Sequence, residues 1–272
     1  METALQRLKT FYYFPFVNFA LLMMKRKKIL LGKNTARLFR LNNGLHEYLF
    51  KGILWFLLFF FVFSIIPVVL FKFFPPPVTP LMFLRARAMK SSGDTIHLSY
   101  KWVPIEEMSP YLYRAAIAAE DDHFMTHHGF NFGAMEQALE SNEKNEKFIK
   151  GGSTISQQTS KNVFLWPNRD YLRKGLEAWF TILTEQIWGK KRIMEVYLNV
   201  VELGDDVFGV EAASMKYFKK HASELNQWEA ASLIAVFPNP HIYKVIKPSP
   251  YTQRYRNAIV YRMSVMPKVE FK

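Results

Sequence analysis

The stretch Gly151–Asn162, with the sequence GGSTISQQTSKN, is the most informative part of this 272-residue chain. It predicts a helix over about 153–163, preceded by two glycines that let the backbone approach a ligand closely. The hydroxyls, the amides and Lys161 form a dense set of donors suited to an anion or a sugar. The spacing is not that of a Walker loop. The alternative interpretation, a polar helix start, does not readily explain the adjacent Gln157 and Gln158.

Upstream of this stretch, three acids stand at the end of an Ala-rich helix. Ser109 followed by Pro110 predicts the start of that helix, and Glu120-Asp121-Asp122 marks its end. Negative charge is unfavourable at a helix C-terminus. Acids kept there indicate a carboxylate with a raised pKa, suited to general-base catalysis. A solvated acidic helix end is the alternative interpretation.

Two histidines follow these acids. His123 and His127 are four residues apart and could face one way, as zinc ligands do. A third ligand is not evident nearby in the sequence, which disfavours zinc.

Downstream of the glycine pair, charged residues recur at helical spacing. Arg169, Arg173 and Glu177 are each four residues apart, so they line one edge of a helix, with Lys174 beside them. An apolar face lies next to that edge. Taken alone, a surface ion-pair ladder explains this pattern equally well.

The remaining helical segments indicate a mainly α domain without persistent strand alternation. Asn226 with Glu229 resembles a capping box. Glu195, Tyr197 and Asn199 are candidate polar supports within the core. The helical segments are expected near 153–163, 171–188, 190–201, 209–218 and 226–236.

Residues 53–71 contain no charge and lie between Lys51 and Lys72. As a helix they extend about 28 Å, enough to cross a hydrocarbon core. A buried core helix is the alternative, disfavoured because so long a Phe-rich uncharged run is rare in a small soluble domain. Residues 1–51 hold ten Lys or Arg against two Glu, so the N-terminus is expected inside and the domain outside.

The sequence thus predicts four parts. Residues 1–51 form a basic cytoplasmic arm, with Met23 or Met24 as an alternative start. Residues 52–72 are the transmembrane helix, 73–99 a linker and membrane-proximal segment, and 100–272 the main domain. The net charge of +13 lies mostly beside the span, which argues against a nucleic-acid partner. The chain has no cysteine, which excludes disulfides and thiolate chemistry.

Together, these clusters resemble the peptidoglycan glycosyltransferases of glycosyltransferase family 51, most closely the monofunctional biosynthetic kind. The resemblance covers roughly residues 75–250. One departure is Asn131, where the family usually has Asp, which weakens any role for a charge there. The matching segments are Glu120 to Gly129, Gly151 to Asn162, Arg169 to Glu177, Arg192 to Phe218, and Glu229 to Pro240.

The resemblance implies a lysozyme-like, mainly helical domain that dips a hydrophobic jaw into the bilayer. It implies polymerisation of lipid II, an undecaprenyl-pyrophosphoryl disaccharide-pentapeptide, by inverting β-1,4 glycosyl transfer with release of undecaprenyl pyrophosphate. The partners would be lipid II, the growing glycan strand, the lipid bilayer and other cell-wall synthesis or division proteins. The location would be the bacterial cytoplasmic (inner) membrane. We expect no transpeptidase domain, because the sequence ends at Lys272.

The resemblance also implies roles for individual residues. Glu120 would be the general base on the acceptor 4-hydroxyl. Glu177 would assist by orienting the cations or a Mg²⁺ ion, whose site the sequence does not locate. The leaving pyrophosphate would be stabilised by Lys161, Arg169 and Arg173, and the site shaped by Ser153, Thr154, Gln157, Gln158 and Asn162.

Two other functions remain open from the sequence. A lysozyme-like hydrolase of the same glycan would also use two carboxylates, and Glu120 with Glu177 could serve. An inactive membrane-tethered wall-binding scaffold is the non-enzymatic alternative. Retention of the acids and cations argues against lost activity.

Orientation in the membrane gives the first testable prediction. A reporter fused after Lys272 should lie outside the cytoplasmic membrane, because the basic residues precede the span. Reporters that are active on only one side of the membrane measure this directly. A fusion that works only in the cytoplasm would contradict the topology.

Overall fold

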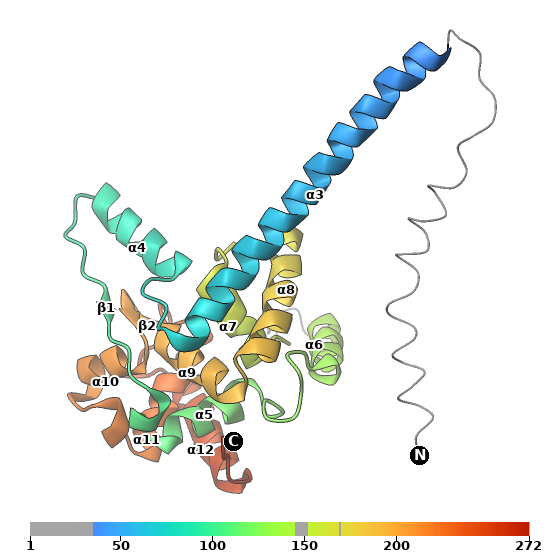
Figure 1. Ribbon diagram of the computed structural model, residues 1–272. Coiled ribbons are helices and arrows are strands. Elements are labelled where there is room, and N and C mark those ends of the chain that lie inside the picture. Colours follow the sequence, from blue (N-terminus) through green and yellow to red (C-terminus); the bar gives the residue numbers. More distant parts are fainter. Residues whose placement is uncertain (1–34, 145–151, 169, 272) are drawn as a thin grey trace, which may run out of the picture. The chain divides into compact units, whose positions relative to one another are not determined.

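The computed structural model describes residues 35–144, 152–168 and 170–271 (Figure 1). Most of the basic arm, the alternative starts at Met23 and Met24, and Arg169 lie outside these residues. The chain divides into two compact units, Met1–Phe60 and Phe61–Lys272.

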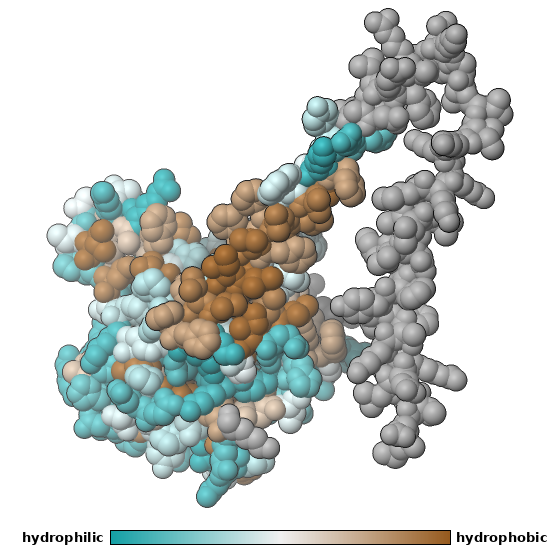
Figure 2. All heavy atoms as spheres, viewed as in Figure 1, coloured by the Kyte–Doolittle hydropathy of each residue, from teal (hydrophilic) through white to brown (hydrophobic). Residues whose placement is uncertain are grey.

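Helix α3, Thr35–Phe73, contains the predicted span. Its segment His46–Phe73 is long and apolar enough to cross a membrane and contains an 18-residue window with a mean hydropathy of 2.9. A core helix of a soluble protein would be mostly buried, whereas Trp55 and Phe56 are 59% and 68% exposed. Figure 2 shows the apolar surface of this helix. Pro67 lies inside the helix, as spanning helices tolerate.

The second unit is mainly helical, as predicted. Its core lies around α9, in which every residue from Ile193 to Val200 is buried. Helix α7 packs on α8 and α9, and α5 packs on α11 and α12. The helices are α4 (Pro80–Ser91), α5 (Pro110–Glu120), α6 (Phe132–Lys144), α7 (Ile155–Phe164), α8 (Tyr171–Ile187), α9 (Lys190–Val200), α10 (Val210–Phe218), α11 (Gln227–Ile234) and α12 (Pro250–Val265), with 3₁₀ turns η1 (Ile105–Glu107) and η2 (Ala222–Glu224).

The expected helices over 153–163, 171–188, 190–201, 209–218 and 226–236 correspond to α7 to α11. Helices α4, α6 and α12 were not predicted. Two of them carried a usable signal, because Thr79-Pro80 and Ser249-Pro250 repeat the cap-and-proline pattern of Ser109-Pro110. Helix α4 lies inside the segment predicted as a linker.

A three-stranded sheet was also not predicted. Strand β1 (Ser99–Tyr100) pairs in parallel with β3 (Val207–Phe208), and β2 (Glu202–Gly204) pairs with β3 in antiparallel orientation. Strands of two or three residues are too short to show the alternation that identifies a strand in a sequence.

Within the second unit, side chains of the domain hold the end of α3. The indole Nε1 of Trp188 donates to the carbonyl of Val68 at 2.6 Å. The guanidinium of Arg192 donates to the carbonyl of Phe71 at 2.8 and 3.1 Å, and to that of Phe74 at 2.8 Å. The Phe71 carbonyl is one of those that a helix end leaves without an intrahelical partner.

Gly209 provides a stability prediction. Its φ is +79°, and an added Cβ would stand 2.4 Å from the carbonyl oxygen of Asn199. We expect Gly209→Ala to lower the free energy of unfolding by about 1–3 kcal/mol or more, because both the backbone conformation and the space exclude a side chain. The control is Gly175→Ala in α8, where nothing lies within 4 Å. That substitution should stabilise by about 0.5–1 kcal/mol. Equal unfolding midpoints for wild type and Gly209→Ala would contradict the prediction.

Candidate active site

Helix α5 brings Glu120 to the site. Ser109 caps its start through Tyr111 N–H, and Pro110 occupies the first turn. The small buried residues Ala115 and Ala116 permit close packing of the helix. Glu120 is the last residue of α5, where the sequence analysis expected the acidic cluster.

The carboxylate of Glu120 is held by a neutral amide. Its Oε2 accepts a hydrogen bond from Gln158 Nε2 at 2.9 Å. Burial raises the pKa of Glu120 above its ordinary value. The Gln158 hydrogen bond and the charge of Lys161 act in the opposite direction, and the charge of Asp121 adds to the rise. Such a carboxylate is suited to accept a proton near neutral pH.

Asp121 has a different environment. Its Oδ2 accepts from the backbone N–H of Ile155 at 3.0 Å and contacts His127 Nε2 at 2.8 Å. Since Gly129 N–H donates to His127 Nδ1 at 3.0 Å, the histidine proton lies on Nε2 and points to Asp121. This chain of contacts joins the end of α5 to the start of α7.

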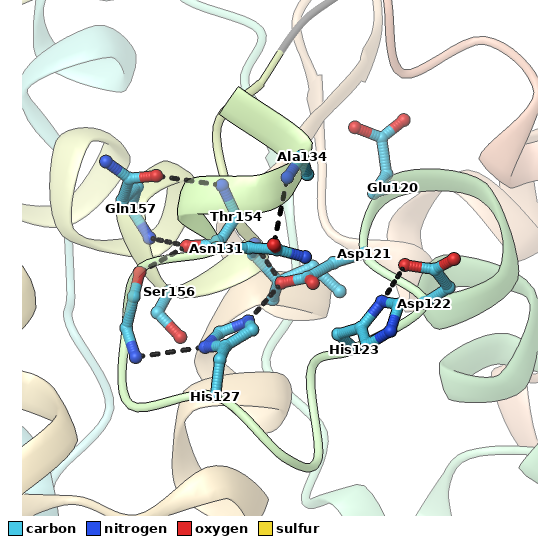
Figure 3. A network of polar contacts seen from close by, with 12 residues as sticks. Glu120, Asp121, Asp122, His123, His127, Asn131, Ala134, Thr154, Ser156 and Gln157 are labelled. Atoms are coloured by element: carbon cyan, nitrogen blue, oxygen red, sulfur yellow. Dashed lines mark hydrogen bonds and ion pairs between the residues drawn. The ribbon is translucent and has the colours of Figure 1, made fainter. Parts of the chain in front are cut away.

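Asp122 and its neighbours face elsewhere. Figure 3 shows Asp121 pointing toward His127 and Thr154, whereas Asp122 points to His123. The Asp122–His123 contact is 2.6 Å and exposed. The two histidines therefore contact different acids, and no group of three or more His, Asp or Glu in the described ranges could hold a metal ion.

The start of α7 forms one wall of a small pocket. Thr154 Oγ1 accepts from Gln157 N–H, and the side chain of Gln157 accepts from Thr154 N–H, in a capping box. Both side chains are buried, so these hydrogen bonds fix the backbone that forms the pocket wall. The pocket has a volume of about 40 Å³ and is lined by Glu120, Asp121, Asp122, Asn131, Ala134, Gly152, Ser153 and Thr154.

The predicted ion-pair edge of α8 is present but largely buried. Arg173 Nη1 donates to Glu177 Oε2 at 2.6 Å, and Lys174 Nζ pairs with Glu177 Oε1. Lys174 Nζ also lies 3.4 Å from Ser153 Oγ, which connects this edge to the pocket wall. Arg173 and Glu177 are 8% and 3% exposed, so a surface ladder does not describe them.

The structure brings most of the predicted site residues together. Gln158 and Lys161 lie near Glu120, and Ser153 connects to the α8 edge. Asn162 is partly buried on α7. The sequence analysis assigned no role to two residues that contact site residues or their helices. Lys174 was noted without a role, and Tyr255 belongs to the unpredicted α12, where its hydroxyl donates to Ala119 O at 3.4 Å.

The polar supports expected from the sequence are present in α9. Asn199 Oδ1 accepts from Val103 N–H and its amide donates back to the carbonyl of Val103. Glu195 accepts from Ile105 N–H and pairs with Arg192. Tyr197 donates to Gln158 Oε1 at 3.1 Å.

Comparison with known proteins is consistent with this geometry. The model of the transglycosylase family matches residues 90–264, a range that includes the whole site. The chain belongs to the transglycosylase family. The biosynthetic peptidoglycan transglycosylase of Caulobacter vibrioides is 53% identical over 190 residues, covering 70% of this chain and 80% of that protein. Proteins of the same name from Bdellovibrio bacteriovorus and Bacteroides thetaiotaomicron are 50% and 42% identical, each covering 78% of this chain and 84% and 85% of their own. The lysozyme-like fold class expected from the sequence is thereby confirmed.

Neighbouring acids of this transglycosylase allow a matched stability test. Asp121→Ala would leave Ile155 N–H and His127 Nε2–H buried without an acceptor, at a cost of about 1–3 kcal/mol for each group. Asp122→Ala removes only an exposed contact and should change the free energy of unfolding by less than about 0.5 kcal/mol. Denaturant or thermal unfolding of both variants in detergent measures the difference. Equal losses would contradict the structural role of Asp121.

Proposed function

We propose that this transglycosylase polymerises lipid II into the glycan strands of peptidoglycan, with inversion at the donor sugar and release of undecaprenyl pyrophosphate. The observation that supports this most is that Glu120, a carboxylate of raised pKa, lies near Lys161, a cation suited to phosphate oxygens. The names of the related proteins agree with a biosynthetic role.

In this proposal Glu120 is the general base. Its carboxylate takes the proton from the 4-hydroxyl of the acceptor N-acetylglucosamine. The resulting oxygen nucleophile forms a bond to the anomeric carbon of the donor N-acetylmuramic acid while the bond to the pyrophosphate oxygen breaks. A raised pKa makes Glu120 a better proton acceptor at neutral pH than an ordinary carboxylate.

The leaving group is a pyrophosphate, which needs positive charge rather than a proton. Lys161, Arg169 and Arg173 supply that charge in our proposal, as fixed electrostatic stabilisers. Arg173 Nε is buried without a hydrogen-bond partner within the described part of the chain. Arg173 thus contributes its positive charge to the leaving group rather than this donor. Glu177 orients Arg173 and Lys174 by accepting from both.

The same contacts disfavour the hydrolase alternative. A glycosidase requires a second carboxyl group directed at the sugar. Glu177 is 3% exposed, and each of its oxygens accepts from a cation. Neither oxygen is therefore directed at a scissile bond, so Glu177 does not supply the second carboxyl group that this alternative assigned to it.

We also propose that a divalent cation, Mg²⁺, takes part, bound mainly by the substrate rather than by protein ligands. The described residues contain no group of three or more His, Asp or Glu that could hold it. Mg²⁺ commonly takes only one or two carboxylates and fills its remaining positions with phosphate oxygens and water. The substrate pyrophosphate would thus provide most of its ligands, and no step of the proposed reaction depends on it.

We also propose the orientation and surroundings of the enzyme. The basic residues before the apolar segment of α3 favour a cytoplasmic N-terminus and a domain on the periplasmic or outer side of the inner membrane. A membrane-anchored enzyme and its lipid-linked substrate would both be confined to the same bilayer. Proteins of cell-wall synthesis or division are the partners that this location favours.

The role of Glu120 can be tested by Glu120→Gln. The amide cannot accept the proton, so turnover of lipid II should fall by about 10²–10⁴-fold while the protein still folds and inserts into membranes. Gel analysis of glycan ladders from fluorescent lipid II measures turnover, and thermal unfolding provides the control. Near-normal turnover would remove Glu120 from the role of base.

The cations can be tested by Lys161→Ala and Arg173→Ala. Charge that develops only in the transition state makes these residues matter more for kcat than for KM. We expect a loss on the order of 10²–10³-fold in kcat with a small change in KM. The wild-type protein should leave purified glycan strands intact. Strand shortening by wild type and by Lys161→Ala alike would favour the hydrolase.

A further inference from the structure

Three side chains from three helices form a continuous hydrogen-bonded chain that ends on the proposed base. Tyr197 of α9 donates its hydroxyl proton to Gln158 Oε1 at 3.1 Å. Gln158 of α7 donates from Nε2 to Glu120 Oε2 at 2.9 Å. Glu120 ends α5, so the chain crosses from the central core helix to the site.

The donors and acceptors of this chain can be ordered in only one way. An ionised carboxylate only accepts hydrogen bonds, so Gln158 must turn its NH₂ group toward Glu120. Its amide oxygen then faces Tyr197, which must donate. Rotation of the amide by 180° would put a carbonyl oxygen against the carboxylate, which is unfavourable. It would also make the phenol accept from the NH₂ group instead of donating, a weaker contact because a phenol is a better donor than acceptor.

The tyrosine end of this chain is rigid. Tyr197 has no exposed surface, and its ring packs edge-on against Phe237 with centroids 5.7 Å apart. Burial raises the pKa of Tyr197 well above its ordinary value, which keeps the phenol protonated and able to donate. The hydroxyl is therefore a fixed donor over the pH range in which the enzyme would work.

Other charged and titratable groups also face Glu120. Lys161 of α7 lowers its pKa, and the adjacent Asp121 raises it. Tyr197 from α9 and Tyr255 from α12 are the phenols that sense its charge, and the pKa of both is raised. A change confined to the Tyr197 hydroxyl leaves Lys161, Asp121 and Tyr255 in place.

We propose that Tyr197 is a positioning residue for the transfer reaction: it locks the Gln158 amide so that an N–H always faces Glu120 and the base stays ionised. The inference rests on the proposed function of Glu120 as general base. Tyr197 touches no substrate in this role and acts only through Gln158.

The test uses Tyr197→Phe in the full-length protein, which keeps the buried ring and removes the hydroxyl. The freed amide turns its carbonyl toward Glu120 part of the time, so the carboxylate binds its proton more tightly. The acid limb of the kcat/KM profile for fluorescent lipid II should move to higher pH by about one unit, as expected for loss of one hydrogen bond to a charged group. Turnover should fall about tenfold below that limb and recover toward wild type above it.

Tyr217→Phe is the matched control. Its hydroxyl also makes one hydrogen bond, to the carbonyl of Leu203 at 3.2 Å, and belongs to α10 rather than to the site. It should leave the pH profile unchanged. A second variant, Gln158→Met, removes the amide itself and should shift the acid limb at least as far as Tyr197→Phe. The double variant Tyr197→Phe/Gln158→Met should behave as Gln158→Met alone, because Tyr197 acts through Gln158.

A direct titration separates this inference from the proposed function. In protein labelled with ¹³C at the glutamate carboxyl, the Glu120 resonance is identified by its loss in Glu120→Gln. A higher titration midpoint in Tyr197→Phe supports the positioning role even if Glu120→Gln retains turnover, in which case only the role of base fails. An unchanged midpoint and a pH-independent loss of turnover would overturn the positioning role, and additive effects in the double variant would do the same.

Discussion

The site depends on the two hydrogen bonds that Asp121 accepts at the end of α5. One comes from the first residue of α7 and the other from His127, whose tautomer is set by Gly129 N–H. A buried carboxylate with these partners ties a helix C-terminus to a helix N-terminus, where the helix dipole favours negative charge. Glu120 precedes Asp121 directly, so its place relative to Gln158 follows from this connection.

Acids of the domain differ in the groups from which their carboxylates accept hydrogen bonds. Glu177 has a cation on each oxygen, and Glu185 accepts from Lys190 and from Ser156. Glu120 instead accepts from the neutral amide of Gln158, and burial raises its pKa. In the proposed function, Glu177 orients Arg173 and Lys174 toward the leaving group, while the amide-bound Glu120 remains able to take a proton.

Contacts within the second unit join the end of α3 to the domain. Trp188 and Arg192 bind carbonyl groups at the end of α3, and Phe71 stacks on Phe164 with centroids 6.1 Å apart. Phe164 belongs to α7, which also carries Gln158 and Lys161. Arg192 belongs to α9, which also carries Tyr197. The part of α3 within the second unit therefore belongs to the folded domain rather than to a loose tether.

By itself the sequence determined the helical class, the apolar segment, the end of α5 at the acids and the capped start of α7, because these depend on local spacing and cap residues. It also placed Glu120, Lys161 and Arg173 in one site through a family resemblance. Tertiary structure alone decided which acid is amide-bound and which is held by cations, since Glu120, Gln158 and Tyr197 come from three helices distant in the chain. The short sheet and the contact of Tyr255 with α5 likewise arose from packing between distant segments, for which no local pattern of residues exists.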